Sequence, residues 1–370
     1  MPALGLSAGL RKARELGRRT LSLALARPRM VQPRARYQPR AHDAILILQR
    51  GDNPSTDYYL RPRLEASGVP SVVVDLSADP RSCALLQPGG AQALMVVFCR
   101  YAQEPWLRAI EGMRDRLARA AFFMDDDLPA MLVDPTLPRS VRGKVALHFA
   151  SHVERLGAVC SEVWVSTSVL AERYAEAHPA VLQPIPEADP PEPSPRAPPR
   201  VAYHGTDVHG AEQRFVMEIA RRLQALAPEA VVELIGGPPL ARACAGLGNV
   251  AITPQASWAA YRERLRGETA ALSLAPLAPS EVNDARAPVK VFDAARLGAA
   301  GIYADAAPYR GAVADGQDGL LLPMAPDAWA AAVAELLQHP QRRLSLARAA
   351  RARLLALRAQ AHAFPAAPDA

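Results

Sequence analysis

Residues 200–237 read RVAYHGTDVHGAEQRFVMEIARRLQALAPEAVVELIGG, and this stretch decides the fold class. Its apolar runs at 200–203 and 231–235 have the length and the β-branched content of strands. Between them, residues 212–226 carry apolar side chains at helical spacing, and a Gly-Gly-Pro turn follows the second run. A strand, a helix and a second strand in this order predict a parallel sheet covered by helices.

The same alternation continues in both directions from this stretch. Downstream it predicts strands at 250–253, 271–275, 301–303 and 319–322, and helices at 258–266, 289–297 and 326–337. Upstream it predicts strands at 44–48, 71–75, 93–98, 120–124 and 163–166, and helices at 58–67, 106–118, 140–156 and from about 167. The expected fold class is therefore α/β, with two Rossmann-like domains of similar size that face each other across an interdomain cleft.

A proline-rich stretch sets the domain boundaries. Residues 184–200 hold eight prolines in seventeen positions, which permits neither a helix nor a central strand and indicates an interdomain linker. We expect a basic N-terminal arm at 1–42, an acceptor domain at 43–183, a second domain at 201–340, and a C-terminal helix with a tail at 341–370. That last helix, at 342–357, is long enough to reach the first domain.

Composition limits the class of protein. Half of the 370 residues are hydrophobic, so the chain can bury a large core, yet no run approaches the roughly 18 apolar residues of a membrane span. The four cysteines are scattered, which indicates reduced, buried thiols in a cytoplasmic protein. A signal-peptide interpretation of residues 18–27 fails on a short apolar core followed by Arg27.

The positive charge is concentrated in the N-terminal arm. The net charge is +6, but residues 1–42 carry ten basic side chains and only Glu15, so the rest of the chain is acidic. Leu10, Ala13, Leu16, Thr20 and Leu23 recur at helical spacing between these arginines. This largely apolar stripe favours peripheral contact of residues 1–40 with an anionic membrane on its inner face. The alternative is a solvated, disordered extension with no partner. Nucleic-acid binding is not expected, because the arm has little aromatic interleaving.

Polar residues follow two predicted strands of the second half, where ligands of open α/β sheets bind. After 200–203 comes His204-Gly205-Thr206, in which Gly205 lets a ligand approach the backbone, and His209 can donate to a phosphate. After 271–275 come Lys290 and Asp293, three residues apart and so on one helix face. A lysine at a helix start suits a diphosphate, and the carboxylate suits a ribose. The alternative is an ordinary surface ion pair.

These residues belong to a longer pattern that resembles a known family. The matching residues are Ala275-Pro-Leu, Asn283, Pro288-x-Lys290-x-x-Asp293-Ala-Ala-x-x-Gly298, Tyr309, Gly316-x-x-Gly319-Leu-Leu-Leu and Trp329. They resemble the donor half of retaining, family-four-type glycosyltransferases with the GT-B fold, in the branch of polysaccharide and O-antigen synthesis. Similar stretches at 122–128, 163–171 and 201–209 extend the resemblance over roughly residues 44 to 350.

The resemblance implies a transferase that moves a sugar from a nucleotide-sugar to a glycan or lipid-linked acceptor, with retention and without metal or other cofactor. Positive charge on the leaving diphosphate would be the largest catalytic contribution. We expect Lys290 and His209 there, assisted by the Gly205-Thr206 backbone and Arg214, with Asp293 on the ribose and Asn283 on the sugar or phosphate.

The sequence also departs from this family. Many relatives carry two glutamates eight residues apart, where this chain has Ala285 and the shorter Asp293. The usual glycine-rich loop after the first strand is replaced by residues 49–53, in which only Gly51 remains. Two rival interpretations remain. A sugar-nucleotide epimerase would share the two-domain outline and bind the same donor, and a non-catalytic scaffold of the same fold is motivated by these departures.

An acidic triplet ends the strand predicted at 120–124. We expect Asp126 and Asp127 to bind or polarise the acceptor. Two alternatives remain for the triplet, a divalent-metal Asp-x-Asp site that begins at Asp125 and a helix N-cap. His148 and His152 share a predicted helix face at metal-ligand spacing, but they lack a third ligand and are interpreted as structural.

Overall fold

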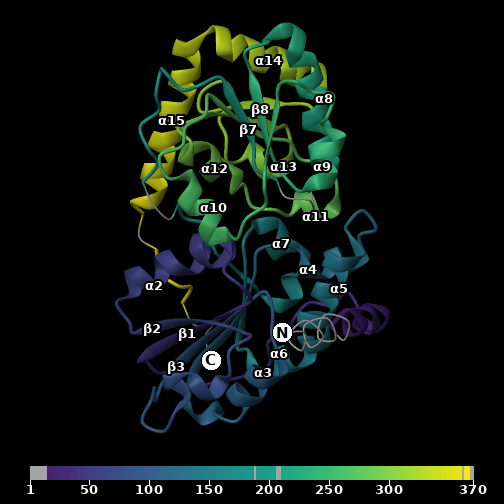
Figure 1. The fold of residues 1–370 in the computed structure, drawn as a ribbon. Coiled ribbons are helices and arrows are strands. Elements are labelled where there is room, and N and C mark those ends of the chain that lie inside the picture. Colours follow the sequence, from purple (N-terminus) through teal and green to yellow (C-terminus); the bar gives the residue numbers. More distant parts are fainter. Residues whose placement is uncertain (1–14, 187–188, 206–209, 361, 367–370) are drawn as a thin grey trace, which may run out of the picture. The chain divides into compact units, whose positions relative to one another are not determined.

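The structure is a computed structural model that describes residues 15–186, 189–205, 210–360 and 362–366 (Figure 1). The chain divides into two compact units. The first contains the chain up to Gln183 together with the tail from His362, and the second runs from Pro184 to Ala361. The polypeptide therefore enters the second unit once and returns to the first at its end.

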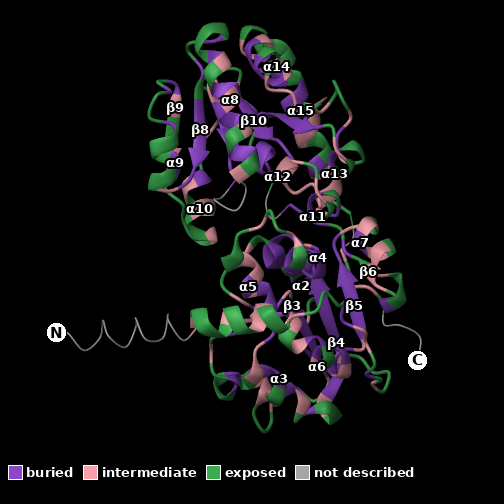
Figure 2. Cartoon of the chain, turned by 90° about the vertical axis from the view of Figure 1, so that its right-hand side faces the viewer, coloured by how far each residue is buried: buried purple, intermediate pink, exposed green. Residues whose placement is uncertain are grey.

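The first unit is built on a six-stranded, fully parallel sheet in the order β2-β1-β3-β4-β5-β6. Its strands are β1 (Ala44–Gln49), β2 (Ser71–Asp75), β3 (Leu94–Cys99), β4 (Leu117–Met124), β5 (Glu162–Val165) and β6 (Ala180–Val181). β1 and β3 are buried along their whole length, as expected for strands covered on both faces, and β3 is labelled in Figure 2. The predicted strands are thus present, and β6 is an addition.

Helices connect these strands. They are α2 (Arg61–Ser67), α3 (Glu104–Glu111), α4 (Leu128–Val133), α5 (Arg139–His148), α6 (Val153–Val159) and α7 (Ser168–Arg173). The helix predicted at 106–118 ends earlier, because the chain from Leu117 pairs with β3 as part of β4. The helix predicted at 140–156 is broken by a 3-10 turn at Ala150–His152, and at the break Phe149 turns into the core and stacks on Phe122.

The second unit repeats the plan with the sheet order β12-β11-β10-β7-β8-β9. All neighbouring strands are again parallel. The strands are β7 (Arg200–Tyr203), β8 (Val231–Ile235), β9 (Val250–Thr253), β10 (Leu272–Ala275), β11 (Ala300–Ala304) and β12 (Leu320–Leu322). The helices are α8 (Gly210–Leu226), α9 (Pro238–Ala243), α10 (Trp258–Leu265), α11 (Glu281–Asp284), α12 (Lys290–Arg296), α13 (Ala307–Arg310), α14 (Pro326–Gln338) and α15 (Pro340–Arg358).

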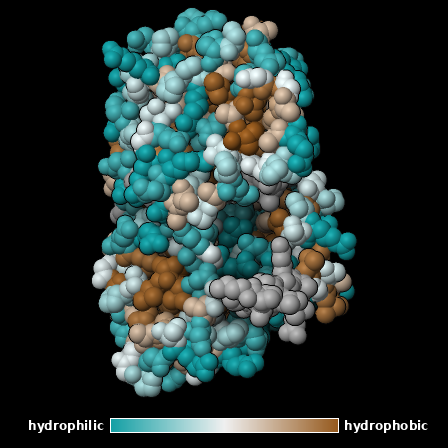
Figure 3. Space-filling model, viewed as in Figure 1, coloured by the Kyte–Doolittle hydropathy of each residue, from teal (hydrophilic) through white to brown (hydrophobic). Residues whose placement is uncertain are grey.

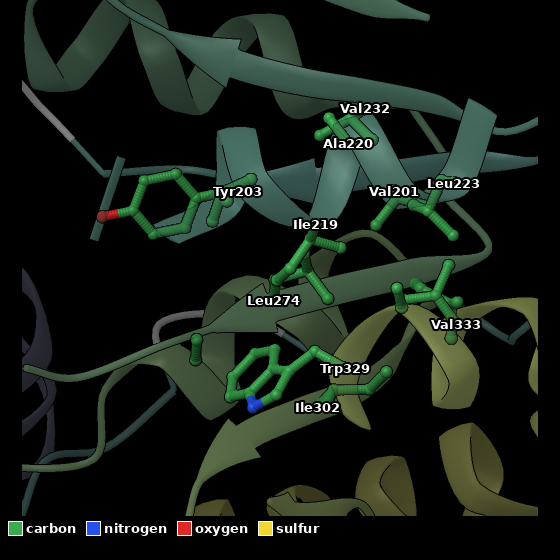
Figure 4. Close-up of a cluster of buried hydrophobic side chains, with 14 of the residues drawn as sticks. Val201, Tyr203, Ile219, Ala220, Leu223, Val232, Leu274, Ile302, Trp329 and Val333 are labelled. Atoms are coloured by element: carbon green, nitrogen blue, oxygen red, sulfur yellow. The ribbon is translucent and has the colours of Figure 1, made fainter. Parts of the chain in front are cut away.

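Alternating side chains of β7 serve two different cores. Val201 lies in the larger core, shown in Figure 4 with Ile219 and Leu223 of α8 and Trp329 of α14. Ala202, the next residue, points to the opposite face and joins a smaller cluster with Leu265 and Leu297. The Trp329 ring meets Phe215 of α8 edge-on, at 5.3 Å between ring centroids, and its indole N–H donates to the Pro323 carbonyl. β7 is therefore held from both faces.

The N-terminal segment packs on the first unit rather than extending freely. Residues 15–25 are helical, and the backbone N–H of Arg34 donates to the Gly157 carbonyl of α6 at 2.8 Å. Met30 and Val31 are buried. At Gly157 a Cβ atom would lie 2.5 Å from the Gln32 carbonyl, so only glycine admits the segment this closely.

The side of this helix that faces the domain differs from the predicted apolar stripe. Leu16 is 62% exposed, and it is Glu15 and Arg19 that are half-buried. Leu10 and Ala13, which the stripe also included, lie outside the described residues. Leu23 of the stripe is half-buried, whereas Leu21 and Leu25 face solvent as Leu16 does.

The proline-rich stretch is fastened to the second unit along α15. Arg343, Arg351 and Arg358 of that helix donate to the carbonyls of Pro195, Pro190 and Pro186. Prolines offer carbonyls but no N–H, so a row of arginines is a suitable partner for such a segment. These three arginines have a structural role, whereas the sequence alone favours the interpretation of single arginines as solvated surface residues.

The remaining surface has few apolar features. On the face shown in Figure 3 most residues are hydrophilic, and apolar ones gather in separate patches. All four cysteines are buried and none is in a disulfide, as predicted for the thiols. In the part of the chain that the structure describes, no helix has both the length and the apolar character needed to cross a membrane.

Candidate functional site

The order of the second sheet creates a switch point between β7 and β10. From β7 the strand order runs through β8 to β9, and from β10 it runs the opposite way through β11 to β12. Connections leaving the two central strands therefore diverge, and the carboxyl ends of these strands are the general ligand position in open α/β sheets. His204 and Gly205 follow β7 there, and Pro276 follows β10.

Lys290 lies at this switch point. It is the first residue of α12, and its Nζ donates to the His204 carbonyl at 2.6 Å and to Asp293 Oδ2 at 2.9 Å. About a third of its side chain stays exposed, at 31%. The lysine thus joins the end of β7 to the start of α12, and its partly exposed side chain places a positive charge beside a helix N-terminus.

Asp293 is the buried partner of two cations. Its Oδ2 accepts from Lys290, and its Oδ1 accepts from Arg296 at 3.1 Å. Burial opposes ionisation, but the charges of Lys290 and Arg296 outweigh it and hold the pKa of Asp293 below its usual value. The carboxylate is therefore ionised at neutral pH. Sequence reasoning missed Arg296, although its spacing of three residues from Asp293 was a usable signal.

His204 is a second residue that sequence reasoning left without a role. Its ring is buried, and Nδ1 lies 2.9 Å from the Tyr261 hydroxyl. Burial lowers the pKa of His204 to about 3, and the charges of Lys290, Arg200 and Arg264 act in the same direction against the opposing carboxylate of Asp293. The imidazole is therefore neutral beside the Lys290–Asp293 pair.

Asn283 is held inside its own turn. Its Nδ2 donates to the Ala278 carbonyl at 2.7 Å and to Glu212 Oε1 of α8 at 3.3 Å, and Glu212 also accepts the N–H of Ala278 at 3.2 Å. Both amide hydrogens are thus used within the protein. Asn283 fixes the loop after β10 to α8, and a ligand contact would have to use its amide oxygen.

The loop after β7 is described only in part. Gly205 is packed against Tyr203, because a Cβ atom there would lie 2.1 Å from the tyrosine hydroxyl oxygen. Thr206 and His209 lie outside the described residues, so their expected roles stay predictions. Arg214 is exposed on the first turns of α8, with its guanidinium 3.5 Å from the Cβ position of Gly210.

The first sheet has its own switch point, between β1 and β3, with charged residues beside it. Arg100 follows β3 directly, and Asp125 and Asp126 follow β4. The guanidinium donates to Asp126 Oδ2 at 2.8 Å and lies 3.3 Å from Asp125 Oδ1. Ser55 donates to Asp125 at 2.6 Å. Burial raises the pKa of Asp125, although Arg100 opposes this.

The two aspartates predicted to meet the acceptor have different surroundings. Asp126 is paired with Arg100 and keeps 22% of its side chain exposed. Asp127 is fully buried and is the N-cap of α4, accepting the N–H of Ala130 at 2.9 Å, while Arg173 and Tyr174 also donate to it. These are the partners of a capping residue, which was one alternative for the triplet.

The carboxylates of the Asp-x-Asp motif are engaged with arginines. Asp125 meets Arg100, and Asp127 meets Arg173. Within the described ranges, no three His, Cys, Asp or Glu side chains are grouped so that they could hold a metal ion. His148 ends α5 and His152 lies in the 3-10 turn beyond it, so the continuous helix face predicted for the pair is not formed.

Comparisons with known proteins identify the fold. No family model matches the chain, and no curated protein matches it. An α-glucosyltransferase solved with UDP-glucose and DNA containing an abasic site matches 87% of this chain and 96% of its own, with a TM-score of 0.57 and 10% identity. HepE of Anabaena, solved with UDP and glucose, matches 85% of this chain and 95% of its own, with a TM-score of 0.52 and 13% identity.

A third solved structure, TarM, matches 71% of this chain with a TM-score of 0.52 and 11% identity. This chain spans about half the length of TarM, 51%. The shared architecture is the GT-B fold, with two Rossmann-like domains that are each built on a parallel sheet. The predicted fold class, α/β with two Rossmann-like domains, is thus confirmed.

Proposed function

We propose that this chain is a glycosyltransferase that moves a sugar from a nucleotide-sugar to a glycan or lipid-linked acceptor in cell-surface polysaccharide synthesis. The observation that carries the proposal is Lys290. Its partly exposed side chain lies at the β7–β10 switch point, oriented by Asp293 and by the His204 carbonyl. HepE, of the same fold, was solved with UDP and glucose, which makes UDP the first nucleotide to test.

In this proposal the second unit holds the donor. The ammonium of Lys290 and the N-terminus of α12 stabilise the charge that develops on the leaving diphosphate, which is the term expected to lower the barrier most. Arg214, His209 and the Gly205-Thr206 backbone assist, and Asn283 meets the sugar or phosphate through its amide oxygen.

Asp293 accepts from the ribose hydroxyls in this proposal. Both of its oxygens already meet cations, and a carboxylate oxygen has lone pairs for a further hydrogen bond. The sugar is transferred with retention, and neither a metal nor another cofactor takes part.

The first unit takes the acceptor, with Asp126 as the polar contact and Asp127 as a cap of α4. Leucines at 16, 21 and 25 remain 62%, 63% and 71% exposed on the N-terminal helix, beside Arg18 and Arg27. This surface is suited to peripheral contact with an anionic membrane that presents a lipid-linked acceptor.

The direct test is calorimetric binding of a panel of nucleoside diphosphates and their sugars. Wild type is expected to bind one diphosphate, and Lys290→Ala and Asp293→Ala are expected to weaken it about 10- to 100-fold, the range for a lost charge-assisted hydrogen bond. Arg221→Ala, at an exposed position of α8, is the matched control and should bind like wild type.

The same experiment separates the rival interpretations. If the folded protein binds no nucleotide across the panel, the enzyme proposal fails and the non-catalytic scaffold is favoured. The scaffold interpretation is motivated by Ala285, at a position where many relatives carry glutamate. If a nucleotide-sugar is bound and isomerised without any acceptor, the protein is an epimerase.

A further inference from the structure

Four cations from separate parts of the first unit converge at the carboxyl end of its sheet. Arg50 directly follows β1, Arg100 directly follows β3, Lys144 comes from α5, and Arg19 comes from the N-terminal helix. Lys144 Nζ and Arg100 Cζ lie 5.0 and 5.6 Å from the centroid of the same ring, that of Tyr101. β1 and β3 flank the switch point of this sheet, where a ligand is expected.

The carboxylates of the cluster do not balance these cations. Arg100 is met by Asp125 and Asp126, whereas Arg19 and Arg50 share the single carboxylate of Glu15, at 2.6 and 3.4 Å. Lys144 has no carboxylate partner in the described part of the chain, and its ammonium lies over the Tyr101 ring. Arg19, Arg50 and Lys144 thus have one directly paired carboxylate, that of Glu15, and Arg50 also interacts with the more distant carboxylate of Asp75.

Partial burial makes this excess charge expensive. Arg19 and Arg50 keep only 25% and 27% of their side chains exposed, and the Nε atom of each is buried without a hydrogen-bond partner among the described residues. Burial, together with the charges of Arg100, Arg50 and Arg19, lowers the pKa of Lys144 to about 8. Burial and the charges of Arg50 and Arg19 lower the pKa of His148 to about 3. Such an arrangement is stabilised when an anion enters it.

The choice of lysine is itself informative. Of the 43 lysines and arginines in the chain only three are lysines: Lys12, Lys144 and Lys290. Lys290 occupies the switch point of the second sheet, whereas Lys144 comes from α5, between β4 and β5, and places its ammonium over the ring of Tyr101, which follows β3. Lysine offers a compact point charge and arginine a planar fork, and together they suit the several oxygens of a phosphate group.

The backbone at Arg100 supports a functional purpose for this cluster. Arg100 has a φ of 66°, in the left-handed region that arginine rarely adopts. Its N–H still donates to the Phe123 carbonyl of β4, at 2.8 Å. Strain of this kind tends to persist where a side chain must be held at a ligand site.

We propose that Arg19, Arg50 and Lys144 form an anion site of the first unit that binds the phosphate or diphosphate group of the acceptor. The identification of the ligand with the acceptor rests on the proposed transferase function, whereas the anion site itself does not. Arg100 orients Asp126 beside the site, so that the acceptor phosphate and the attacking hydroxyl are bound by neighbouring residues.

The scarcity of lysine allows a direct test on the full-length protein. The protein is labelled with a limiting amount of acetic anhydride, and acetylation of Lys144 and Lys290 is quantified on separate peptides by mass spectrometry. Inorganic pyrophosphate, the probe, is expected to lower labelling of Lys144 about tenfold at ten times its dissociation constant. Unchanged labelling of Lys144, or an equal decrease in sodium chloride of the same ionic strength, would overturn the proposal.

Variants of the same unit serve as controls. Arg50→Gln is expected to raise the pyrophosphate concentration that half-protects Lys144 about tenfold, the effect of one lost charge-assisted contact. Arg139→Gln, at an exposed position of α5, should leave it unchanged. Arg19→Gln replaces Arg50→Gln if the latter does not fold. Equal protection of Lys144 in wild type, Arg50→Gln and Arg139→Gln would contradict the assignment of Arg50 to the anion site.

Further arms distinguish the two proposals and the two sources of phosphate. UDP should protect Lys290 at a lower concentration than it protects Lys144, so a failure of the nucleotide proposal is read on a different peptide from a failure of the anion site. Protection of Lys144 by vesicles that carry a polyprenyl diphosphate, compared with vesicles lacking it, assigns a lipid-linked acceptor. Protection by a soluble sugar phosphate alone assigns a soluble acceptor, and protection by neither overturns the identification with the acceptor.

Discussion

His204 is a buried histidine of the second unit whose pKa is strongly lowered. It is kept neutral because its buried ring lies near Lys290, Arg200 and Arg264, so that protonation would add a further positive charge in a medium of low polarity. The carboxylate of Glu233 lies 3.8 Å from Nε2, but it is paired with Arg200 at 2.6 Å. The neutral imidazole thus leaves Lys290 as the available charge at the end of β7.

This neutral histidine makes the second unit sensitive to acid. The pKa of His204 falls from its ordinary value of 6.5, which the unfolded chain retains, to about 3 on folding. Its contribution to stability is therefore complete above pH 6.5 and is lost as the pH falls towards 3. The free energy of unfolding should fall by up to about 1.4 kcal/mol per pH unit in this window. His204→Asn should flatten the slope between about pH 6.5 and 4.5, measured by urea unfolding.

The control for this prediction is His339→Gln, because the side chain of His339 is 62% exposed at the end of α14. It should keep the wild-type slope. An equal slope in wild type and in His204→Asn would mean that His204 is protonated in the folded protein and that its environment is more polar than the structure indicates.

At the scale of elements, the N-terminal segment is part of the first unit. The backbone N–H groups of Arg34 and Ala35 donate to the carbonyls of Gly157 and Cys160, and the Tyr37 hydroxyl donates to the Val159 carbonyl. Val31 is completely buried in this segment. The segment is therefore held against the C-terminal end of α6 by backbone hydrogen bonds.

Placing a charge in this segment should destabilise the first unit alone. Val31→Asp is expected to lower its free energy of unfolding by about 3 kcal/mol, because an unpaired carboxylate would be buried. Leu25→Asp, at a position that is 71% exposed, should change it by less than about 0.5 kcal/mol. Hydrogen exchange measured on peptides of β1, β3 and β4 would report the difference, and equal protection in the two variants would show that the segment is not docked in solution.

At the scale of the molecule, the last residues complete a domain that begins at the other end of the chain. Phe364 stacks on Trp164 of β5, with ring centroids 5.4 Å apart, and the carbonyls of Pro365 and Ala363 accept from Arg119 and Arg63. The Arg119 guanidinium is also paired with Glu162, at 2.6 and 2.7 Å. The tail thus adds an aromatic contact and two acceptors to the first unit.

Removing the tail should therefore weaken the first unit and not the second, although α15 directly precedes it. A chain truncated after Gln360 is expected to lose about 2 kcal/mol of first-unit stability, the sum of an aromatic contact and hydrogen bonds to charged groups. Hydrogen exchange should rise in β4 and β5 and stay constant in β10 and β11. Equal changes in both sheets would show that the tail stabilises the second unit as well.

Local sequence patterns predicted most of the elements correctly. The strands and the helices α8, α12, α14 and α15 follow from periodicity within ten or twenty residues, and the Lys290–Asp293 pair follows from a spacing of three. The broken helix at 148–153 did not follow, because its cause is the burial of Phe149 against Phe122 of another element. Asp127 could not be assigned either, since an N-cap and a ligand-binding carboxylate have the same sequence context after a strand.

What the sequence determined by itself was the alternation of strands and helices, the division at the prolines, and the local pairing on α12, all set by interactions between near neighbours in the chain. Only the tertiary structure decided which strands became neighbours. The order of the sheets places the His204 carbonyl, 86 residues distant in sequence, against Lys290, and it gathers Arg19, Arg50, Arg100 and Lys144 at one sheet edge. Contacts of this range depend on strand order and burial, which no periodicity within a single element encodes.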